Sequence, residues 1–344
     1  MKILALDLGM NKSVACVLDT DSHAYAFETF RTEPRKLREL MLAVQPNQVV
    51  FEVCSISGWV RDLCEELGCR YDVANPSHEA WRWRHVKRKS DRIDALKLAR
   101  LAAMNQLPTV HVPTREVRQW RALVVYRHTL VRRRTRVKNH IRSLLLTHGL
   151  RLPPGQGGWT KAALAEIHDH VASEEPGALW KVTLRVELDQ FEAVSRAIER
   201  VEQELDAIAI RRPRVALVQT IPGVGPRLAE LIVSVIDDPH RFRTGRQVGS
   251  YAGLTPRQYQ SGESNRRGRI SRQGNPLLRA MLVEVSWVSL RYNPVIRAVY
   301  ERTCRGSRAR RKIAIVAVAR RLLVWAWAML RDNTPWRPPQ PALT

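Results

Sequence analysis

The sequence predicts an α/β domain at the N-terminus, then long helices and a mainly helical C-terminal region. Strand-like and helix-like segments alternate up to about residue 110, and two long stretches with helical periodicity follow. The charge is a further guide, because 57 Lys and Arg residues against 33 Asp and Glu give a formal net charge of +24 over 344 residues. So basic a chain is expected to bind a polyanion, most simply nucleic acid.

A membrane surface is the other anionic partner, but the sequence favours a cytoplasmic protein. We expect no signal peptide, and no apolar run of about 18 residues is free of charge. The nearest run, residues 313–330, contains Arg320 and Arg321, so we expect a buried amphipathic helix in which Trp325 and Trp327 pack. The five cysteines lack paired zinc spacing, which fits a reducing cytoplasm, and we expect their thiols to be buried.

The order of elements near the N-terminus indicates a particular sheet. The expected elements are strands at 2–6, 13–18 and 24–29, a helix at 33–43, a strand at 49–51, a helix at 59–67 and a strand at 70–73. Three strands followed by alternating helix and strand is the order of an RNase H-like α/β fold. The Asn75–Pro76 pair then marks a stop.

Carboxylates occupy the ends of two of these strands and the start of the next helix. Asp7 ends the first strand, and Glu52 ends the fourth. Ser90 is expected to cap a helix whose first turn carries Asp91 and Asp94 on nearly the same face. Acidic residues in a first turn are usually only partners of the helix dipole. With strand-end carboxylates nearby, however, they indicate a pocket for hard divalent cations with oxygen ligands.

Residues 114–148 are predicted to form one long helix with a very high arginine content. Like charges spaced four residues apart repel, and a helix tolerates this best beside a polyanion. We therefore favour phosphate contact over a solvated face. The side chains expected to make that contact are Arg127, Arg132, Arg133, Arg134, Arg136 and Lys138.

A second long helix is predicted over residues 179–210, where apolar residues recur at near-heptad spacing. The two long helices are expected to pair with each other or with another copy of the chain as a coiled coil. Between them, residues 151–177 contain several Pro and Gly residues, which predicts an irregular insertion around one short helix.

A glycine loop precedes the next predicted helix, residues 228–236. Gly223 and Gly225 lie in the segment 220–226, and a Gly-x-Gly loop that opens a helix exposes backbone N–H groups able to hold a phosphate. Helix-hairpin-helix elements bind DNA in this way. The alternative is a simple turn between two helices.

Residues 253–275 combine small nucleophiles with arginines. We expect a tight exposed loop from Tyr259 to Gly262 that presents Ser261. A serine among arginines is what phosphoryl transfer through a covalent protein intermediate needs. By chemistry alone, Ser264 and Ser271 are equally eligible, and a solvated loop serine is the alternative. The arginines expected to neutralise a phosphodiester here are Arg257, Arg266, Arg267 and Arg269.

Taken together, these motifs resemble the DEDD-type insertion-sequence transposases, the family that includes Piv-like invertases and bridge-RNA-guided recombinases. The matching segments are Asp7, Glu52, Asn75–Pro76, 89–94, 221–225, 252–259 and 261–262. The resemblance implies that Asp7, Glu52, Asp91 and Asp94 form a metal-binding tetrad and that Ser261 is the nucleophile. The chain departs from the family after Glu52, where Val53–Trp59 replaces a Thr-Gly-x-Tyr-like turn.

The resemblance also implies a division of the chain and an activity. It implies a RuvC-like catalytic domain at 1–112, a helical coiled-coil linker at 113–212, a transposase domain with a helix-hairpin-helix element and the serine loop at 213–332, and a tail at 333–344. The implied activity is DNA transposition or site-specific recombination with Mg²⁺. A structured guide RNA encoded by the element would select donor and target DNA, and the protein would act as a dimer or tetramer with a composite active site.

Two other classes of function remain open at this point. A metal-dependent, junction-resolving nuclease would use the same tetrad with water as the nucleophile and would give Ser261 no role. A non-catalytic RNA- or DNA-binding protein would leave an intact acidic tetrad unexplained.

Overall fold

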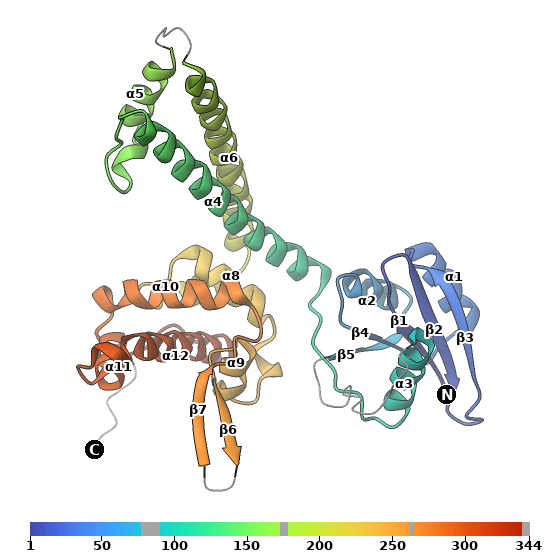
Figure 1. Ribbon diagram of the computed structural model, residues 1–344. Helices are drawn as coiled ribbons and strands as arrows, with labels where there is room; N and C mark the ends of the chain where they lie inside the picture. Colours follow the sequence, from blue (N-terminus) through green and yellow to red (C-terminus); the bar gives the residue numbers. More distant parts are fainter. Residues whose placement is uncertain (77–89, 173–177, 262–263, 339–344) are drawn as a thin grey trace. The chain divides into compact units, whose positions relative to one another are not determined.

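The computed structural model describes residues 1–76, 90–172, 178–261 and 264–338 (Figure 1). The chain divides into two compact units, Met1–Arg118 and Gln119–Thr344, and each is described by itself. The first unit is mixed α/β, and the second is mostly helical, as the sequence predicts. The finer division into a catalytic domain, a linker, a transposase domain and a tail stays a prediction.

The N-terminal unit is built on one five-stranded sheet of order β3-β2-β1-β4-β5. Its strands are β1 (Lys2–Asp7), β2 (Lys12–Asp19), β3 (Tyr25–Arg31), β4 (Gln48–Glu52) and β5 (Arg70–Ala74). The first three pair antiparallel, whereas β4 runs parallel to β1 and β5 runs parallel to β4. All five strands predicted from the sequence are confirmed.

Helices cover both faces of this sheet. Buried side chains of α1 (Pro34–Val44) and α2 (Ser57–Glu66) pack on one face, and those of α3 (Asp91–Ala103) pack on the other. The predicted cap of α3 is confirmed, because the Ser90 hydroxyl accepts a hydrogen bond from the Ile93 N–H at 3.4 Å. Lys89, part of the segment that resembles the family, lies outside the described residues.

In the second unit, two long helices form an antiparallel pair. Arg127 of α4 (Arg115–Thr147) bonds to Glu202 of α6 (Leu179–Ile210), and further along α4 the Nδ1 atom of His140 is 2.9 Å from Glu187. Of the two predicted pairings, the structure has the one within the chain. In the described part of the insertion between them, residues 151–172, one short α-helix, α5 (Lys161–Ala172), packs with both long helices. The apolar side chains buried among the three helices are Val137, Ile141, Leu145, Ile167, Val171, Leu184, Leu188 and Phe191.

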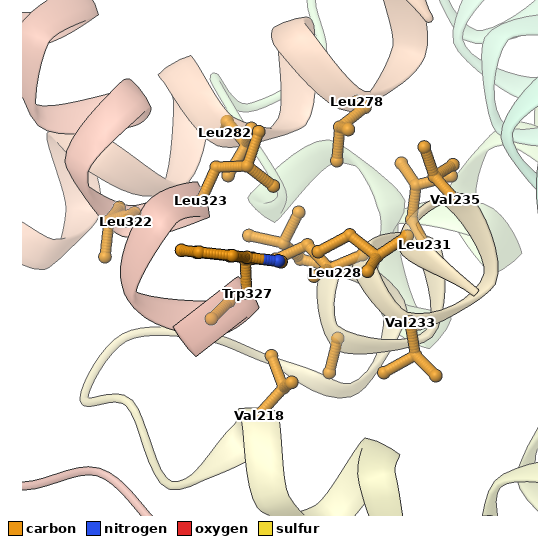
Figure 2. Packing of buried hydrophobic residues seen from close by; sticks show 14 of the residues in the cluster. Val218, Leu228, Leu231, Val233, Val235, Leu278, Leu282, Leu322, Leu323 and Trp327 are labelled. Atoms are coloured by element: carbon orange, nitrogen blue, oxygen red, sulfur yellow. The ribbon is translucent and has the colours of Figure 1, made fainter. Parts of the chain in front are cut away.

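A hydrophobic core joins α8 (Pro226–Ile236), α10 (Pro276–Tyr292) and α12 (Arg311–Asp332). Figure 2 shows the Trp327 indole surrounded by leucine and valine side chains from these helices. The indole N–H donates a hydrogen bond to the Pro239 carbonyl at 2.8 Å. Among the described residues, α12 with its preceding turn is long and apolar enough to cross a membrane, but 56% of that apolar window is buried. The prediction of a buried core helix is confirmed.

The remaining elements complete the second unit. They are α5 (Lys161–Ala172), α7 (Pro213–Gln219), α9 (Gly245–Tyr251), β6 (Pro256–Ser261), β7 (Ser264–Ile270), α11 (Pro294–Cys304), and short 3-10 turns at Gly157–Trp159, Pro239–Arg241 and Arg308–Arg310. The cysteines, from both units, are all free thiols. The expectation that all five are buried was wrong for Cys54, which is exposed because it lies in the loop after β4, and for the partly buried Cys69.

Among the residues that the structure describes in this second unit, one carboxyl group is buried. Glu230 of α8 has no exposed surface, and both of its oxygens accept hydrogen bonds from the Arg227 guanidinium, at 2.8 and 3.0 Å. The same guanidinium also binds Asp206 of α6. Burial raises the pKa of Glu230 to about 7, although the charge of Arg227 acts in the opposite direction. The shared guanidinium ties α6 to α8.

Glu230→Gln should flatten the dependence of stability on pH. The folded pKa of about 7 exceeds the value of about 4.3 expected for an unfolded Glu, so the folded chain binds the additional proton between these values. Stability contributed at this site therefore falls as pH rises through that window. Glutamine does not ionise, so thermal unfolding measured by circular dichroism should vary less with pH between about 5 and 7. If the stability of the wild type and that of Glu230→Gln declined equally as the pH rises from about 5 to 7, the raised pKa of Glu230 would be contradicted.

Candidate active site

Asp7 and Glu52 lie at the same edge of the N-terminal sheet. In the parallel pairing of β1 with β4, Leu6 is opposite Phe51, and the two acidic residues come next in their strands. Parallel strands end at the same edge, so the pairing itself brings the two carboxylates together. Both side chains are partly buried.

Side-chain alternation also fixes the face on which these carboxylates lie. Ala5 of β1 and Val50 of β4 belong to the core that α3 covers. Successive side chains of a strand point to opposite faces, so Asp7 shares the face of Ala5, and Glu52 shares the face of Val50. Both acidic residues therefore lie on the α3 side of the sheet.

The start of α3 reaches the same region. The ammonium group of Lys97 interacts electrostatically with both Asp94 and Glu52, while partial burial lowers the pKa of Lys97. Asp94 is partly buried, and Asp91 is exposed at the first residue of the helix. Sequence reasoning missed Lys97. Its spacing of three residues after Asp94, which places both on one helix face, is the signal that could have found it.

The four acidic residues are the right kind of donor for a hard divalent cation, which takes carboxylate oxygens. Asp7 and Glu52 lie on one side and at one edge of the sheet, and Lys97 interacts with both Glu52 and Asp94. Among the side chains that the structure describes, however, no three His, Cys, Asp or Glu groups gather closely enough to hold a metal ion. The four carboxylates are thus suitable ligands for a divalent metal ion by their chemistry. Their role as a metal-binding tetrad stays a prediction.

Ser261 lies on a β-hairpin, so the expected tight loop from Tyr259 to Gly262 was wrong. β6 and β7 pair antiparallel, and Ser261 stands opposite Ser264. Gly262 and Glu263, which join the strands, lie outside the described residues. A two-residue connection that begins with Gly is typical of hairpins, and this signal in the sequence was missed. β6 is exposed along its whole length.

The register of the hairpin places several candidate groups on one face. Tyr259 stands opposite Arg266, two positions from the Ser261–Ser264 pair. Residues two apart on a strand share a face, so one exposed face carries both serines and the Arg266 guanidinium. The structure therefore does not distinguish Ser261 from Ser264 as the nucleophile.

Ser271 differs from these two serines, because its hydroxyl oxygen is buried. Arg257 lies where the β6–β7 ladder is irregular and donates a hydrogen bond to the Ser271 carbonyl at 3.4 Å. Arg269 is exposed on β7, whereas the side chain of Arg267 lies outside the described part of the chain. Chemistry alone allows Ser271 as a nucleophile, but its buried hydroxyl group removes it from the candidates.

Two glycines fix the base of this hairpin. Gly253 and Gly274 have φ values of +69° and +79°. A Cβ atom on Gly253 would lie 2.0 Å from the Gln273 carbonyl oxygen, and one on Gly274 would lie 1.9 Å from that of Tyr251. The backbone segments before β6 and after β7 therefore cross too closely for a side chain at either glycine.

The basic residues of α4 fall into two groups. The Arg127 guanidinium bonds to Glu202 at 2.9 and 2.5 Å. Lys138 lies 4.8 Å from the centre of the Trp159 ring, and burial lowers the pKa of Lys138. Both side chains are thus engaged within the chain. The other arginines of α4 that are predicted to contact phosphate make no ion pair with any described residue. They are Arg132, Arg133, Arg134 and Arg136.

The glycine loop joins α7 to α8, as the helix-hairpin-helix prediction requires. Gly223 has a φ of +95°, and a Cβ atom there would lie 2.4 Å from the hydroxyl oxygen of Ser289 in α10. Packing against α10 accounts for this glycine. Gly225 is the N-cap of α8, with open space where a side chain would be.

The chain thus combines an α/β unit that carries strand-end carboxylates with a mostly helical unit that carries an exposed serine hairpin, and family models for transposases match both units. A DEDD-type transposase family model for IS110 elements matches residues 4–149, and the model described as "Transposase IS116/IS110/IS902 family" matches residues 215–301. Together they span more than half of the sequence. The chain belongs to the IS110 family of insertion-sequence transposases, enzymes that cleave and join DNA strands.

Two similar proteins match this chain over nearly its full length, and a third matches about a third of it. A "probable family 20 transposase" of Pseudomonas aeruginosa is 28% identical over 98% of this chain and 100% of its own. The "transposase for insertion sequence element IS1111A" of Coxiella burnetii is 29% identical over 98% of this chain and 92% of its own. A "pilin gene-inverting protein" of Moraxella lacunata is 33% identical over 36% of this chain and 38% of its own.

Gly253→Ala should destabilise the second unit. The new methyl group would overlap a backbone oxygen, and the positive φ adds strain, so we expect a loss of about 2 kcal/mol or more. For a unit of this size, that corresponds to a fall of about 4–8 °C in thermal midpoint, measured by calorimetry. Gly225→Ala is the matched control, because open space surrounds that position and its φ is negative. If Gly253→Ala had a thermal midpoint as high as that of Gly225→Ala, the close approach of the two backbone segments at Gly253 would be refuted.

Proposed function

We propose that this transposase exchanges DNA strands through a covalent link between Ser261 and a DNA phosphate. The observation that carries the proposal is the family match in both units. The first matched region contains paired strand-end carboxylates, and the second contains a serine on an exposed hairpin beside Arg266. The family indicates the class of reaction, and these two sites contain the side chains that we propose to carry it out.

The sheet supports assignment of the first unit as RNase H-like, in the RuvC-like form. Three antiparallel strands are followed by two parallel strands on the far side of β1. In such a domain, the first strand supplies a central Asp, a later strand end supplies a second carboxylate, and a helix supplies the others. Asp7 at the end of β1, Glu52 at the end of β4 and the pair on α3 are the residues that we propose for these roles.

Asp7, Glu52, Asp91 and Asp94 would hold the divalent cation that the family implies, which we propose to be Mg²⁺. When bound, Mg²⁺ would polarise the scissile phosphate and stabilise charge on the leaving oxygen. Lys97 offsets the repulsion between Glu52 and Asp94, because its ammonium group interacts with both. The lysine would thereby keep these two carboxylates close to each other.

Ser261 would make the covalent link. Its hydroxyl oxygen would form a bond to phosphorus while the bond to the departing strand breaks, and the hydroxyl proton would end on the released strand oxygen. Arg266, on the same face of the hairpin, would stabilise the charge of the pentavalent phosphorus, with Arg257 contributing from a nearby position on β6. The hydroxyl of a second strand end would then reverse the step and join the DNA.

The proposed partners are donor DNA, target DNA and a structured guide RNA in the cytoplasm. The net charge and the unpaired arginines of α4 would supply phosphate contacts for them. The acidic set and Ser261 belong to different units, so the reaction requires both units to act on one phosphate. We propose that this occurs in a dimer or tetramer of the chain.

Asp7→Asn, and separately Asp94→Asn, should reduce strand exchange by at least about a hundredfold. The amide keeps the shape of the side chain but loses the charge that holds a cation. DNA binding measured by gel shift should persist, because phosphate contact depends on other residues. The control is Asp21→Asn, which changes a highly exposed carboxylate in the same unit. Full activity in either test variant would remove that residue from the tetrad.

Ser261→Ala should eliminate the protein-linked DNA strand on a denaturing gel run after incubation with Mg²⁺. Ser264→Ala is the matched control, because the two serines stand opposite each other on the same face. It should retain the adduct. Free cleaved ends without an adduct in the wild type would instead favour the nuclease that uses water. Loss of the adduct only in Ser264→Ala would move the nucleophile from β6 to β7.

A further inference from the structure

A second basic surface lies where α11 turns into α12, at the ends of these helices (Figure 1). We call it the corner surface, and it comprises the exposed side chains of Arg302, Arg305, Arg308, Arg311 and Lys312. No acidic residue occurs between the first and the last of them. The dense run is visible in the sequence, although sequence reasoning passed over it.

The charges of the corner surface are unpaired. Within the part of the chain that the structure describes, none of the five makes an ion pair with a carboxylate. Exposed arginines elsewhere do so: Arg35 bonds to Glu39 at 2.9 Å, and Arg38 bonds to Glu66 at 2.6 Å. Five neighbouring like charges repel one another, which favours an anionic partner from outside the chain.

The backbone conformation fixes the turn that carries Arg305. Arg305 follows the last residue of α11 with a φ of +48°, in the left-handed region where glycine is the usual residue. A side chain there costs about 1 kcal/mol. The chain thus carries a long cation at a strained position, immediately before Gly306, which also has a positive φ. The same left-handed cap ends α1 at Gln45 and α12 at Asn333, so this conformation fixes the turn after α11 and does not by itself indicate a ligand.

An exposed aromatic ring is connected to one of these cations, Arg311, through a second aromatic residue. Trp287 of α10 is 43% exposed, and its ring meets that of Tyr300 edge to face, with centroids 6.0 Å apart. The Tyr300 hydroxyl in turn lies close enough to Cys304 and Arg311 to interact with both. The indole and the corner surface are therefore linked through one tyrosine.

We propose that the corner surface binds a single strand of nucleic acid, with its cations on successive phosphates and Trp287 stacked on an unpaired base. Cations that follow a backbone, together with an exposed aromatic ring, are the features of single-strand binding sites. A duplex keeps its bases stacked on each other, so it would use the charges but not the indole. The inference rests on the proposed function only in that the chain acts on nucleic acid, and it requires neither the tetrad nor Ser261.

The first test removes charge. Arg305→Gln, Arg308→Gln and Arg311→Gln together should weaken binding of single-stranded oligonucleotides of about twelve residues, measured by fluorescence anisotropy over a range of salt concentrations. Loss of three phosphate contacts should reduce the slope of log affinity against log salt by about 2. The matched control, Arg35→Gln, Arg38→Gln and Arg70→Gln, removes the same charge from arginines near carboxylates and should keep the slope. Equal slopes in the two triple variants would overturn the proposal.

The second test separates stacking from charge. Trp287→Leu should weaken single-strand binding by about fivefold to a hundredfold and leave duplex binding unchanged. RNA and DNA strands of the same sequence are measured in parallel. A larger loss with RNA identifies a guide-RNA strand as the ligand, and a larger loss with DNA identifies an opened donor or target strand. Equal losses on single strands and duplexes would contradict a stacked base.

A membrane is the remaining alternative for a cationic surface with an exposed tryptophan. If the charge variant lost binding to vesicles of anionic phospholipid and bound oligonucleotides as tightly as the wild type, the proposal would be wrong. The oligonucleotides contain no cleavage site, so failure to find the Ser261 adduct would leave these binding results intact. The two proposals can therefore fail separately. Unchanged circular dichroism spectra verify that each variant is folded.

Discussion

The parallel pairing of β1 with β4 is the constraint on which the proposed chemistry depends. It places Asp7 beside Glu52 at one edge, and side-chain alternation turns both toward α3. A shift of the register by one residue would turn either carboxylate to the opposite face of the sheet. The buried residues that precede the acids on both strands hold the register, so the hydrophobic core of the sheet determines where the charged groups lie.

The sequence predicts most elements because their patterns are local. Strand runs, the Ser90 cap and the long helical periodicities are confirmed, since each depends on neighbouring residues alone. The sequence could not predict whether the long helices α4 and α6 pair with each other or with another copy of the chain. An apolar seam on a helix suits either kind of pairing. The β-hairpin was missed because its strands are exposed and polar, and so lack the apolar alternation that indicates a strand.

The candidate site was predictable in residue types but not in detailed contacts. Spacing identifies carboxylates at strand ends, but the position of the Lys97 ammonium near Glu52 depends on how α3 packs on the sheet. Likewise, composition cannot distinguish Arg127, which bonds to Glu202, from Arg132, which lies on the same helix with no such partner. Pairing across helices decides which cations are available to a ligand, and it is set by tertiary structure.

The opposition of Ser261 and Ser264 across the hairpin has an evolutionary consequence. Two hydroxyl groups on one face, directly opposite each other on paired strands, give the hairpin a second group of the same kind as the proposed nucleophile. The reactive role can pass from one strand to the other through point mutations, with no rebuilding of the backbone. In a relative of this chain, residue type alone would therefore not identify the proposed nucleophile, and its strand and register would be needed.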